Sequence, residues 1–163
     1  MTNSNENLPL PDAEKTARYA ETLPQLASLF EGETDAVANL ANFCALLHEA
    51  FRWWWTGFYR IDGGELVLGP FQGPVACTRI KKGRGVCGTA WEREATVVVE
   101  DVEQFPGHIA CSAASRSEIV VPVRNAEGDL WGVLDIDSEH LATFNAVDRQ
   151  WLERAVQLLA EKL

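Results

Sequence analysis

The chain has 163 residues and a mass of 18.0 kDa, a length typical of one domain. It carries 24 Asp and Glu against 14 Lys and Arg, and this net charge of -10 argues against nucleic acid or an anionic membrane as the main partner. No stretch approaches the roughly 18 apolar residues of a membrane span, and the polar first residues do not resemble a secretory signal. We therefore expect a cytoplasmic protein.

The chain contains four cysteines, Cys44, Cys77, Cys87 and Cys111. In a reducing compartment cysteines serve as free thiols, metal ligands or redox centres, and a structural disulfide framework is disfavoured. The composition alone does not show which of these uses applies to the four cysteines.

The first part of the chain predicts two helices. Residues 1–11 lack periodicity and are expected to form a flexible segment ahead of one domain over 12–163. Asp12 is the predicted N-cap of the first helix, which Pro24 is expected to kink or interrupt. Thr34 is the predicted cap of the second helix, whose buried stripe is expected to comprise Val37, Leu40, Ala41, Cys44, Leu47 and Phe51.

The middle of the chain predicts a series of short strands. Residues 56–61 and 65–68 flank Asp62-Gly63-Gly64, which is a hairpin signal. After this hairpin we expect four more strands, over 75–80, 96–100, 118–124 and 130–137. The segments between them are expected to form a glycine-rich connection over 83–88, a short helix over 91–93 and a long loop over 101–116.

The last part of the chain predicts one more helix, and the order of elements then defines the fold class. Asn145 is the predicted N-cap of this helix, and its buried stripe is expected to comprise Val147, Trp151, Leu152, Ala155, Leu158 and Leu159. Strands clustered between helices at both chain ends indicate an α+β domain. Its central sheet is expected to be mainly antiparallel, with the helices on one face.

The last predicted strand places two acids on one face. Because side chains alternate along a strand, Leu134 and Ile136 point one way while Asp135 and Asp137 point the other. One interpretation is a solvated face of an edge strand. The other is a pocket floor, in which neighbouring carboxylates raise one another's pKa and provide a general acid or bind a cation. The acidic face is expected to include Val133, Trp131 and, from the neighbouring strand, Glu118.

Two further motifs suggest sites. Residues 83–88 match G-x-G-x-x-G, but the strand–helix alternation of a dinucleotide-binding domain is lacking, which favours a tight loop. His108 and Cys111 lie three residues apart, and Cys77 and Cys87 are further potential metal ligands. No closely spaced cysteine pair of the kind common in structural zinc sites is present, so a metal site is the weaker alternative.

The thiols divide by their surroundings. Cys44 lies on the apolar stripe of the second helix and is expected to fill the core, with His48 at the core edge satisfied by a hydrogen bond. Cys77, Cys87 and Cys111 lie in or beside irregular polar segments, which favours redox chemistry. The loop that carries Cys111 is long enough to bring this thiol against Cys77, although sequence does not establish the distance.

Five segments in order resemble the free methionine-(R)-sulfoxide reductases, which use a GAF-type domain. The resemblance covers about residues 54–148, and three of the segments each contain one cysteine. The segments are residues 69–77 (GPFQGPVAC), 83–90 (GRGVCGTA), 105–111 (FPGHIAC), 115–122 (SRSEIVVP) and 132–138 (GVLDIDS).

This resemblance implies a single GAF-type domain with a ligand pocket on the sheet face opposite the helices. It implies that Cys111 attacks the sulfoxide, that Cys77 is its disulfide partner and that Cys87 is an alternative resolving thiol. Glu118, Asp135 and Asp137 would line the pocket, and Trp55 and Tyr59 would form its apolar wall.

The resemblance also implies the reaction and the partners. Members of the family reduce the R epimer of free methionine sulfoxide, hold no bound cofactor and are recycled by thioredoxin, for which dithiothreitol substitutes in vitro. They are often homodimers.

The chemistry of the residues agrees with these roles. A thiolate attacks the sulfoxide sulfur while Glu118 or Asp137, as a carboxylic acid, protonates the departing oxygen. The resulting sulfenic acid condenses with a second thiol to a disulfide, which a dithiol reopens. The alternative is a GAF-type small-molecule or redox sensor without turnover.

Overall fold

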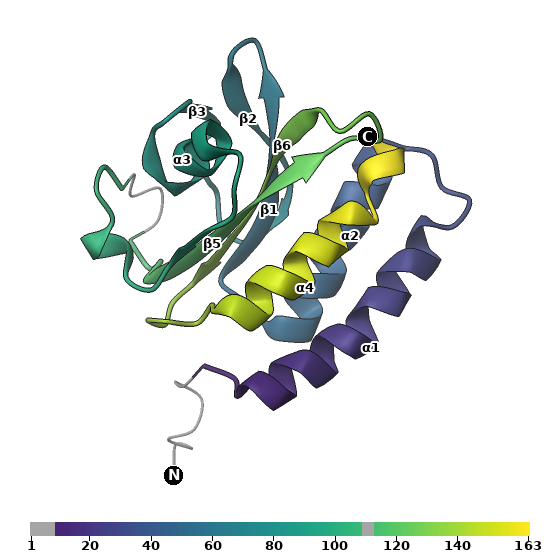
Figure 1. Cartoon of the computed structure of the whole chain (residues 1–163), viewed down its shortest axis with the longest axis horizontal. Coiled ribbons are helices and arrows are strands. Elements are labelled where there is room, and N and C mark those ends of the chain that lie inside the picture. The colour runs from purple at the N-terminus through teal and green to yellow at the C-terminus, as the bar shows by residue number, and fades with distance from the viewer. Residues whose placement is uncertain (1–8, 109–112) are drawn as a thin grey trace.

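The computed structural model describes residues 9–108 and 113–163, so the predicted flexible segment lies largely, and Cys111 entirely, outside the described residues. Figure 1 shows the arrangement. In chain order the elements are α1 (Asp12–Phe30), α2 (Ala36–Phe51), β1 (Trp55–Asp62), β2 (Glu65–Gln72), β3 (Arg79–Lys81), α3 (Gly85–Arg93), β4 (Val97–Val99), η1 (Val102–Gln104), β5 (Ser117–Arg124), β6 (Leu130–Ser138), α4 (Ala146–Gln157) and η2 (Ala160–Lys162).

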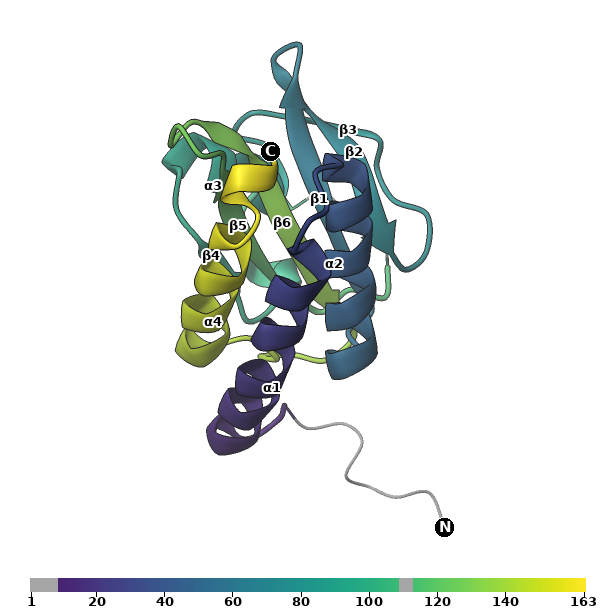
Figure 2. The same ribbon diagram turned by 90° about the vertical axis from the view of Figure 1, so that its right-hand side faces the viewer.

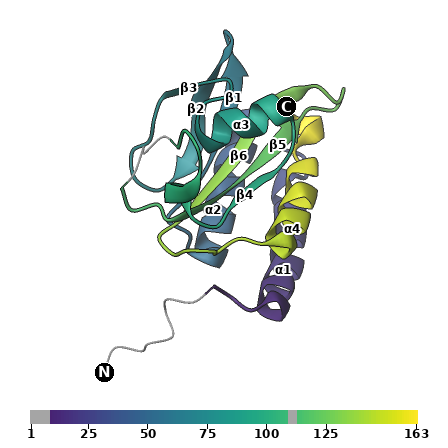
Figure 3. The same cartoon turned by 60° about the vertical axis from the view of Figure 1, so that its left-hand side comes forward.

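Six strands form one antiparallel sheet in the order β3-β2-β1-β6-β5-β4. Helices α1, α2 and α4 cover one face of this sheet, as Figure 2 shows, and α3 covers the other, as Figure 3 shows. The predicted α+β class, the antiparallel sheet and the placement of the terminal helices are therefore confirmed. None of the described helices has the length and apolar character needed to span a bilayer.

The predicted β1–β2 hairpin is confirmed, and it explains why the chain reverses there. Asp62 pairs with Glu65, and Gly63 and Gly64 connect them with φ values of 59° and 82°. Two consecutive positive φ angles suit a tight turn whose twist matches the strands, and glycine adopts them without steric strain.

The two helices at the N-terminal end differ in detail from the prediction. Pro11, not Asp12, is the N-cap of α1, and the helix continues through Pro24 to Phe30. Asp35, not Thr34, caps α2, because its side chain accepts a hydrogen bond from the Ala38 backbone N–H at 2.9 Å. Both predicted caps were therefore wrong by one residue, because sequence patterns locate the end of a helix only to within one or two residues.

The apolar stripes were predicted in outline and wrong at individual positions. In α2, Val37 is 64% exposed and Ala41 is exposed, whereas Phe43 is buried. In α4, Asn145 is the N-cap as predicted, but Leu158 is exposed and Val156 is buried in the core.

Several connections also differ from expectation. Helix α3 begins at Gly85, well before the predicted start at residue 91, and β3 covers only Arg79–Lys81. The predicted long loop contains the short helix η1. The His48 Nδ1 atom is buried without a hydrogen-bond partner among the described residues, so the hydrogen bond expected for this ring is not made through Nδ1.

The helix-covered face contains a buried ion pair that the sequence did not predict. Lys15 of α1 pairs with Asp148 of α4 and also donates to the Thr143 carbonyl at 2.7 Å. Tyr19 donates its hydroxyl to Asp148 at 2.8 Å, and the Asn145 backbone N–H donates to it at 2.9 Å. Every charge buried here has partners, so this cluster ties the two terminal helices together.

Candidate functional site

The two central strands β5 and β6 bring three carboxyl groups to the sheet face opposite α1, α2 and α4. Glu118 lies opposite Asp137, and Val120 lies opposite Asp135, in the antiparallel register. Leu134 and Ile136 point into the helix-side core as predicted. The alternation of β6 thus places both aspartates beside Glu118 on the other face.

Trp131 does not lie on this acidic face, and that part of the prediction was wrong. A register irregularity occurs where β5 ends, so that Arg124 pairs with Leu130 while Val123 pairs with Gly132. The extra residue reverses the alternation at the start of β6. Trp131 therefore packs against the helix-side core, edge-on to Phe58 at 6.2 Å, while Val133 faces the acids' side as predicted.

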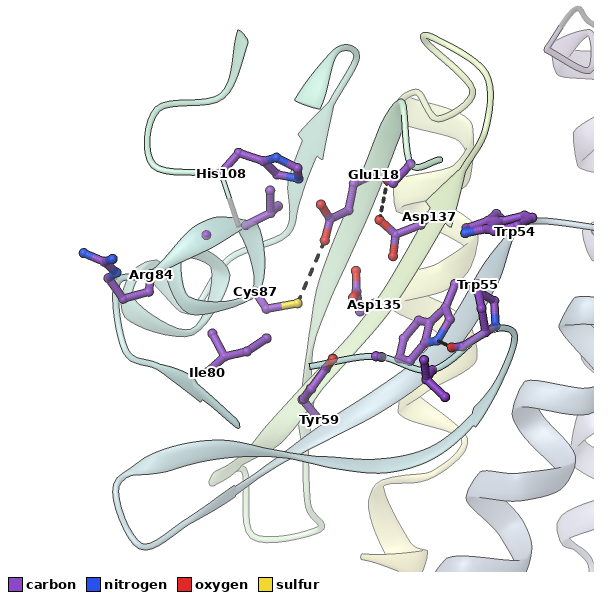
Figure 4. A pocket seen from close by; sticks show the side chains of 16 residues that line it. Trp54, Trp55, Tyr59, Ile80, Arg84, Cys87, His108, Glu118, Asp135 and Asp137 are labelled. Atoms are coloured by element: carbon purple, nitrogen blue, oxygen red, sulfur yellow. Dashed lines mark hydrogen bonds between the residues drawn. The ribbon is translucent and has the colours of Figure 1, made fainter. Parts of the chain in front are cut away.

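A cavity opens on this face, as Figure 4 shows. It lies between β1, the segment after β2, helix α3 and the strands β5 and β6. Its lining includes six of the residues predicted for the site, which are Trp55, Tyr59, Cys87, Glu118, Asp135 and Asp137. The structure thus brings together residues separated by as many as 82 positions in the chain.

Burial and mutual repulsion make the three carboxyl groups hard to ionise. Burial raises the pKa of Glu118 well above its ordinary value, and the charges of Asp135 and Asp137 raise it further. The pKa of Asp137 is raised well above the ordinary range by burial and by Asp135. Burial also raises the pKa of Asp135, while hydrogen bonding with Glu118 and Cys87 partly opposes the shift. The arrangement therefore favours the protonated forms of Glu118 and Asp137, more than water would.

The hydrogen bonds of the three acids are incomplete. Ser115 donates its hydroxyl to Asp137 at 2.7 Å, which fixes the orientation of that carboxyl group. Asp135 is only 6% exposed, yet its Oδ1 atom has no hydrogen-bond partner among the described residues. A buried polar atom without a partner carries a desolvation penalty, and such atoms mark places where a ligand completes the site.

Helix α3 positions Cys87 against the acids. The Cys87 thiol is free and buried, and its Sγ atom lies 4.0 Å from Glu118 Oε1. Its pKa is raised well above the usual value by burial and by the neighbouring acids. Gly88 permits this close packing, because a Cβ there would lie 2.5 Å from the Lys81 carbonyl oxygen. The glycine-rich motif thus begins a short helix, so the prediction of a tight loop over 83–88 was wrong from Gly85 onward.

Two aromatic side chains of β1 form one wall of the cavity. The rings of Trp55 and Tyr59 are stacked at 5.9 Å, and the indole N–H of Trp55 donates to the Pro74 carbonyl at 3.0 Å. The Tyr59 hydroxyl donates to the Cys77 carbonyl at 2.9 Å. Both bonds anchor the segment over 74–77, so the main chain at Cys77 is held at the edge of the cavity.

Sequence reasoning missed several residues that line the cavity. Trp54, Arg84, His108 and Ser115 belong to its lining, and burial lowers the pKa of His108. Their nearness in the sequence to predicted site residues could have indicated them, because each lies within three residues of one. A lone polar residue beside a motif does not by itself reveal which way its side chain points.

Of the remaining cysteines, Cys44 lies in the core as predicted, whereas the redox roles of Cys77 and Cys111 stay predictions. Cys44 is fully buried in the helix-side core, where its thiol donates to the Pro70 carbonyl at 3.3 Å, and burial raises its pKa. Cys111 lies in the segment 109–112, so its predicted position in the site stays a prediction.

Comparison with known proteins identifies relatives along nearly the whole chain. The sequence profile described as "GAF domain" matches residues 25–163. GAF domain-containing protein A of Dictyostelium discoideum is 52% identical over 155 residues, covering 94% of this chain and 98% of the relative. The free methionine-R-sulfoxide reductase of Escherichia coli is 48% identical over 150 residues, covering 91% of this chain and 90% of that protein.

Solved structures agree with the sequence comparison. The free methionine-R-sulfoxide reductase of Neisseria meningitidis, determined in complex with its substrate, superposes with a TM-score of 0.88. It is 57% identical, and the match covers 91% of this chain and 89% of that one.

Proposed function

Because the chain belongs to the GAF-domain family, among the free methionine-R-sulfoxide reductases, we propose that it reduces free L-methionine (R)-sulfoxide to L-methionine. The observation that carries the proposal is a group of three carboxyl groups facing one cavity beside an aromatic wall, with Glu118 and Asp135 buried and Asp137 half-buried. A sulfoxide needs a proton donor for its oxygen, and a free amino acid needs an anionic partner for its ammonium group. Buried acids serve both needs.

Asp135 recognises the ammonium group of the substrate in this proposal. Its unpartnered Oδ1 atom faces the cavity side of the sheet, and none of the ion pairs among the described residues involves it. An ammonium group would supply the missing donor. Trp55 and Tyr59 contact the thioether methyl group, and a sulfur–aromatic contact contributes about 0.3–1.5 kcal/mol.

Glu118 or Asp137 supplies the proton. The thiolate of Cys111 attacks the sulfoxide sulfur, and the protonated oxygen passes to the cysteine, which leaves methionine and a cysteine sulfenic acid. The raised pKa values of Glu118 and Asp137 support this role, because an acid must hold its proton at neutral pH to donate it. Ser115 orients Asp137, and Glu118 lies opposite it on the neighbouring strand.

Cys77 resolves the sulfenic acid, and Cys87 is the alternative. The resolving thiol displaces the hydroxyl group as water and forms a disulfide, which thioredoxin then reopens by exchange. The main chain at Cys77 lies at the cavity edge, where a protein reductant has access. Cys87 lies beneath the acids and is 4% exposed, which favours Cys77. The cycle holds no bound cofactor and requires a reducing compartment such as the cytoplasm.

One assay tests the proposal. The protein is incubated with dithiothreitol and a mixture of both epimers of L-methionine sulfoxide, and the epimers are then separated by chromatography. We expect loss of the R epimer alone, with an equal gain of methionine. Absence of turnover under reducing conditions would refute the enzyme and favour a sensor.

A further inference from the structure

We propose that Cys87, Glu118 and Asp135 form a site for a divalent transition metal ion with the preferences of Zn²⁺, and that the ion excludes substrate from the cavity. The metal binding itself does not depend on the proposed reaction, whereas the competition with substrate rests on it.

Three elements converge to make this site. Cys87 comes from α3, Glu118 from β5 and Asp135 from β6. One donor atom from each residue lies within 4.8 Å of the others, and Figure 4 shows the three side chains directed toward a common point. All three residues are buried, with exposed fractions of 4%, 6% and 6%. Because helix and strands fix their backbones, the donors are brought together by the fold itself.

The spacing is close to what a bound ion requires. Zinc–sulfur and zinc–oxygen bonds of about 2.3 and 2.1 Å at a tetrahedral angle place sulfur and oxygen about 3.6 Å apart. The Cys87 Sγ and Glu118 Oε1 atoms are 4.0 Å apart. A small rotation of the Glu118 side chain therefore suffices to bring this pair to bonding geometry.

The cluster lacks a positive charge, which is the second reason to expect a cation. Among the described residues, the Asp135 Oδ1 atom is buried without a partner, and no Lys, Arg or His side chain forms an ion pair with Glu118 or Asp135. The Lys15–Asp148 pair shows how the same fold balances a buried carboxylate elsewhere. A divalent cation would neutralise the acids and occupy the free lone pair of Asp135.

The donor set selects the kind of metal. One thiolate and two carboxylates suit Zn²⁺, which accepts sulfur and oxygen ligands in tetrahedral sites. Mg²⁺ and Ca²⁺ prefer oxygen ligands only, so a site with Cys87 discriminates against them. Binding displaces the Cys87 thiol proton, and any proton held by the Glu118 and Asp135 carboxyl groups, to solvent and changes no oxidation state. The fourth position faces the cavity, where water completes the coordination.

Cobalt absorption tests the site directly. In a Cys77→Ser/Cys111→Ser protein, Cys44 and Cys87 are the remaining thiols, and Co²⁺ replaces Zn²⁺ as a visible probe. We expect a sulfur-to-cobalt charge-transfer band that disappears when Cys87→Ser is added and persists when Cys44→Ser, the matched control, is added. Absence of the band in the starting protein, or its persistence after Cys87→Ser, would overturn the proposal.

The carboxyl ligands are tested in the same background. Asp135→Asn and Glu118→Gln are each expected to weaken Co²⁺ binding at least about tenfold, since even outer-shell changes cost about 10–100-fold. Thermal unfolding establishes that each variant is folded, and the two substitutions serve as independent tests if one fails to fold. Unchanged affinity in a folded variant would remove that residue from the site.

The competition between Zn²⁺ and the substrate is measured as the methionine released in a single turnover by the reduced wild-type chain without added thiol. Preincubation with Zn²⁺ is expected to suppress release of methionine, and EDTA is expected to restore it. Full turnover with Zn²⁺ bound would overturn the competition. If the chain released no methionine even without metal, the proposed reaction would fail, while the cobalt band would still decide the metal site.

Discussion

Two buried aspartates, Asp148 of α4 and Asp135 of β6, lie on opposite sides of the sheet and show two different uses of a carboxyl group. On the helix-covered face, Asp148 is 1% exposed and accepts hydrogen bonds from Lys15, Tyr19 and the Asn145 backbone. On the cavity face, Asp135 is 6% exposed, lies among other acids and has one oxygen without a partner in the part of the chain that the structure describes.

The partners of each aspartate separate a structural role from a functional one. A buried charge that has all its partners holds elements together, and here it joins α1 to α4. A buried carboxyl group with an oxygen left without a partner stays available to a ligand. Substitutions on the two faces should therefore affect different quantities, namely turnover on the cavity face and unfolding free energy on the helix face.

The largest effect is expected from Cys111→Ser. A serine hydroxyl does not replace the thiolate as nucleophile, so even one equivalent of methionine should not form when the reduced protein meets substrate. Rapid quench followed by quantification of methionine measures this. Cys44→Ser on the helix-side core is the matched control and should retain the stoichiometric burst; methionine release by Cys111→Ser would remove that thiol from the first step.

Glu118→Gln should slow reduction by roughly 10²–10⁴-fold, the range for a lost general acid. The amide occupies the same space but has no acidic proton, so the variant should keep its fold. The initial rate at saturating substrate measures the effect, and Asp137→Asn is the paired variant. An unchanged rate in Glu118→Gln with a large loss in Asp137→Asn would transfer the role of proton donor to Asp137.

On the opposite face, Lys15→Met should destabilise the protein by about 3–5 kcal/mol, because Asp148 would then be a buried charge without its cation. Urea unfolding measures the change. Arg60→Met, which removes the half-exposed ion pair with Asp62, is the control and should change stability by less than about 1 kcal/mol. Equal effects of the two substitutions would contradict the structural role of the buried pair.

The smallest expected effect is a pH dependence of stability on the cavity face. Glu118 has a raised pKa in the folded chain, so its proton stabilises the fold below the ordinary pKa of 4.5, and this contribution is lost as pH rises through the raised value. The slope reaches at most about 1.4 kcal/mol per pH unit for one group. Urea unfolding at several pH values should show a shallower decline in Glu118→Gln, and a steeper decline would contradict the direction of the shift.

The sequence predicted much of the cavity face because a strand repeats every two residues. That period predicts Asp135, Asp137 and Glu118 on one face of the sheet, which the register of β5 and β6 confirms. It failed at Trp131, because the irregularity between β5 and β6 depends on pairing between strands and leaves no mark in either strand alone.

The helix face was predicted only as a pattern of apolar stripes. Lys15 and Asp148 are 133 residues apart, and each is charged on an otherwise ordinary helix. Their contact arises from the packing of α1 against α4, which local periodicity does not encode. The unpartnered oxygen of Asp135 likewise follows from what surrounds it in space, so the metal site was not apparent from cysteine spacing.

The proposed reaction requires that the cavity hold a protonated carboxyl group that can transfer its proton to the substrate. Infrared spectroscopy measures it directly, through the carbonyl stretch that a carboxylic acid shows and a carboxylate lacks. At neutral pH we predict this band in the reduced protein, a loss of intensity in Glu118→Gln, and no change in Asp62→Asn, whose acid is exposed. A spectrum without the band, or one that Glu118→Gln leaves unchanged, would contradict the account.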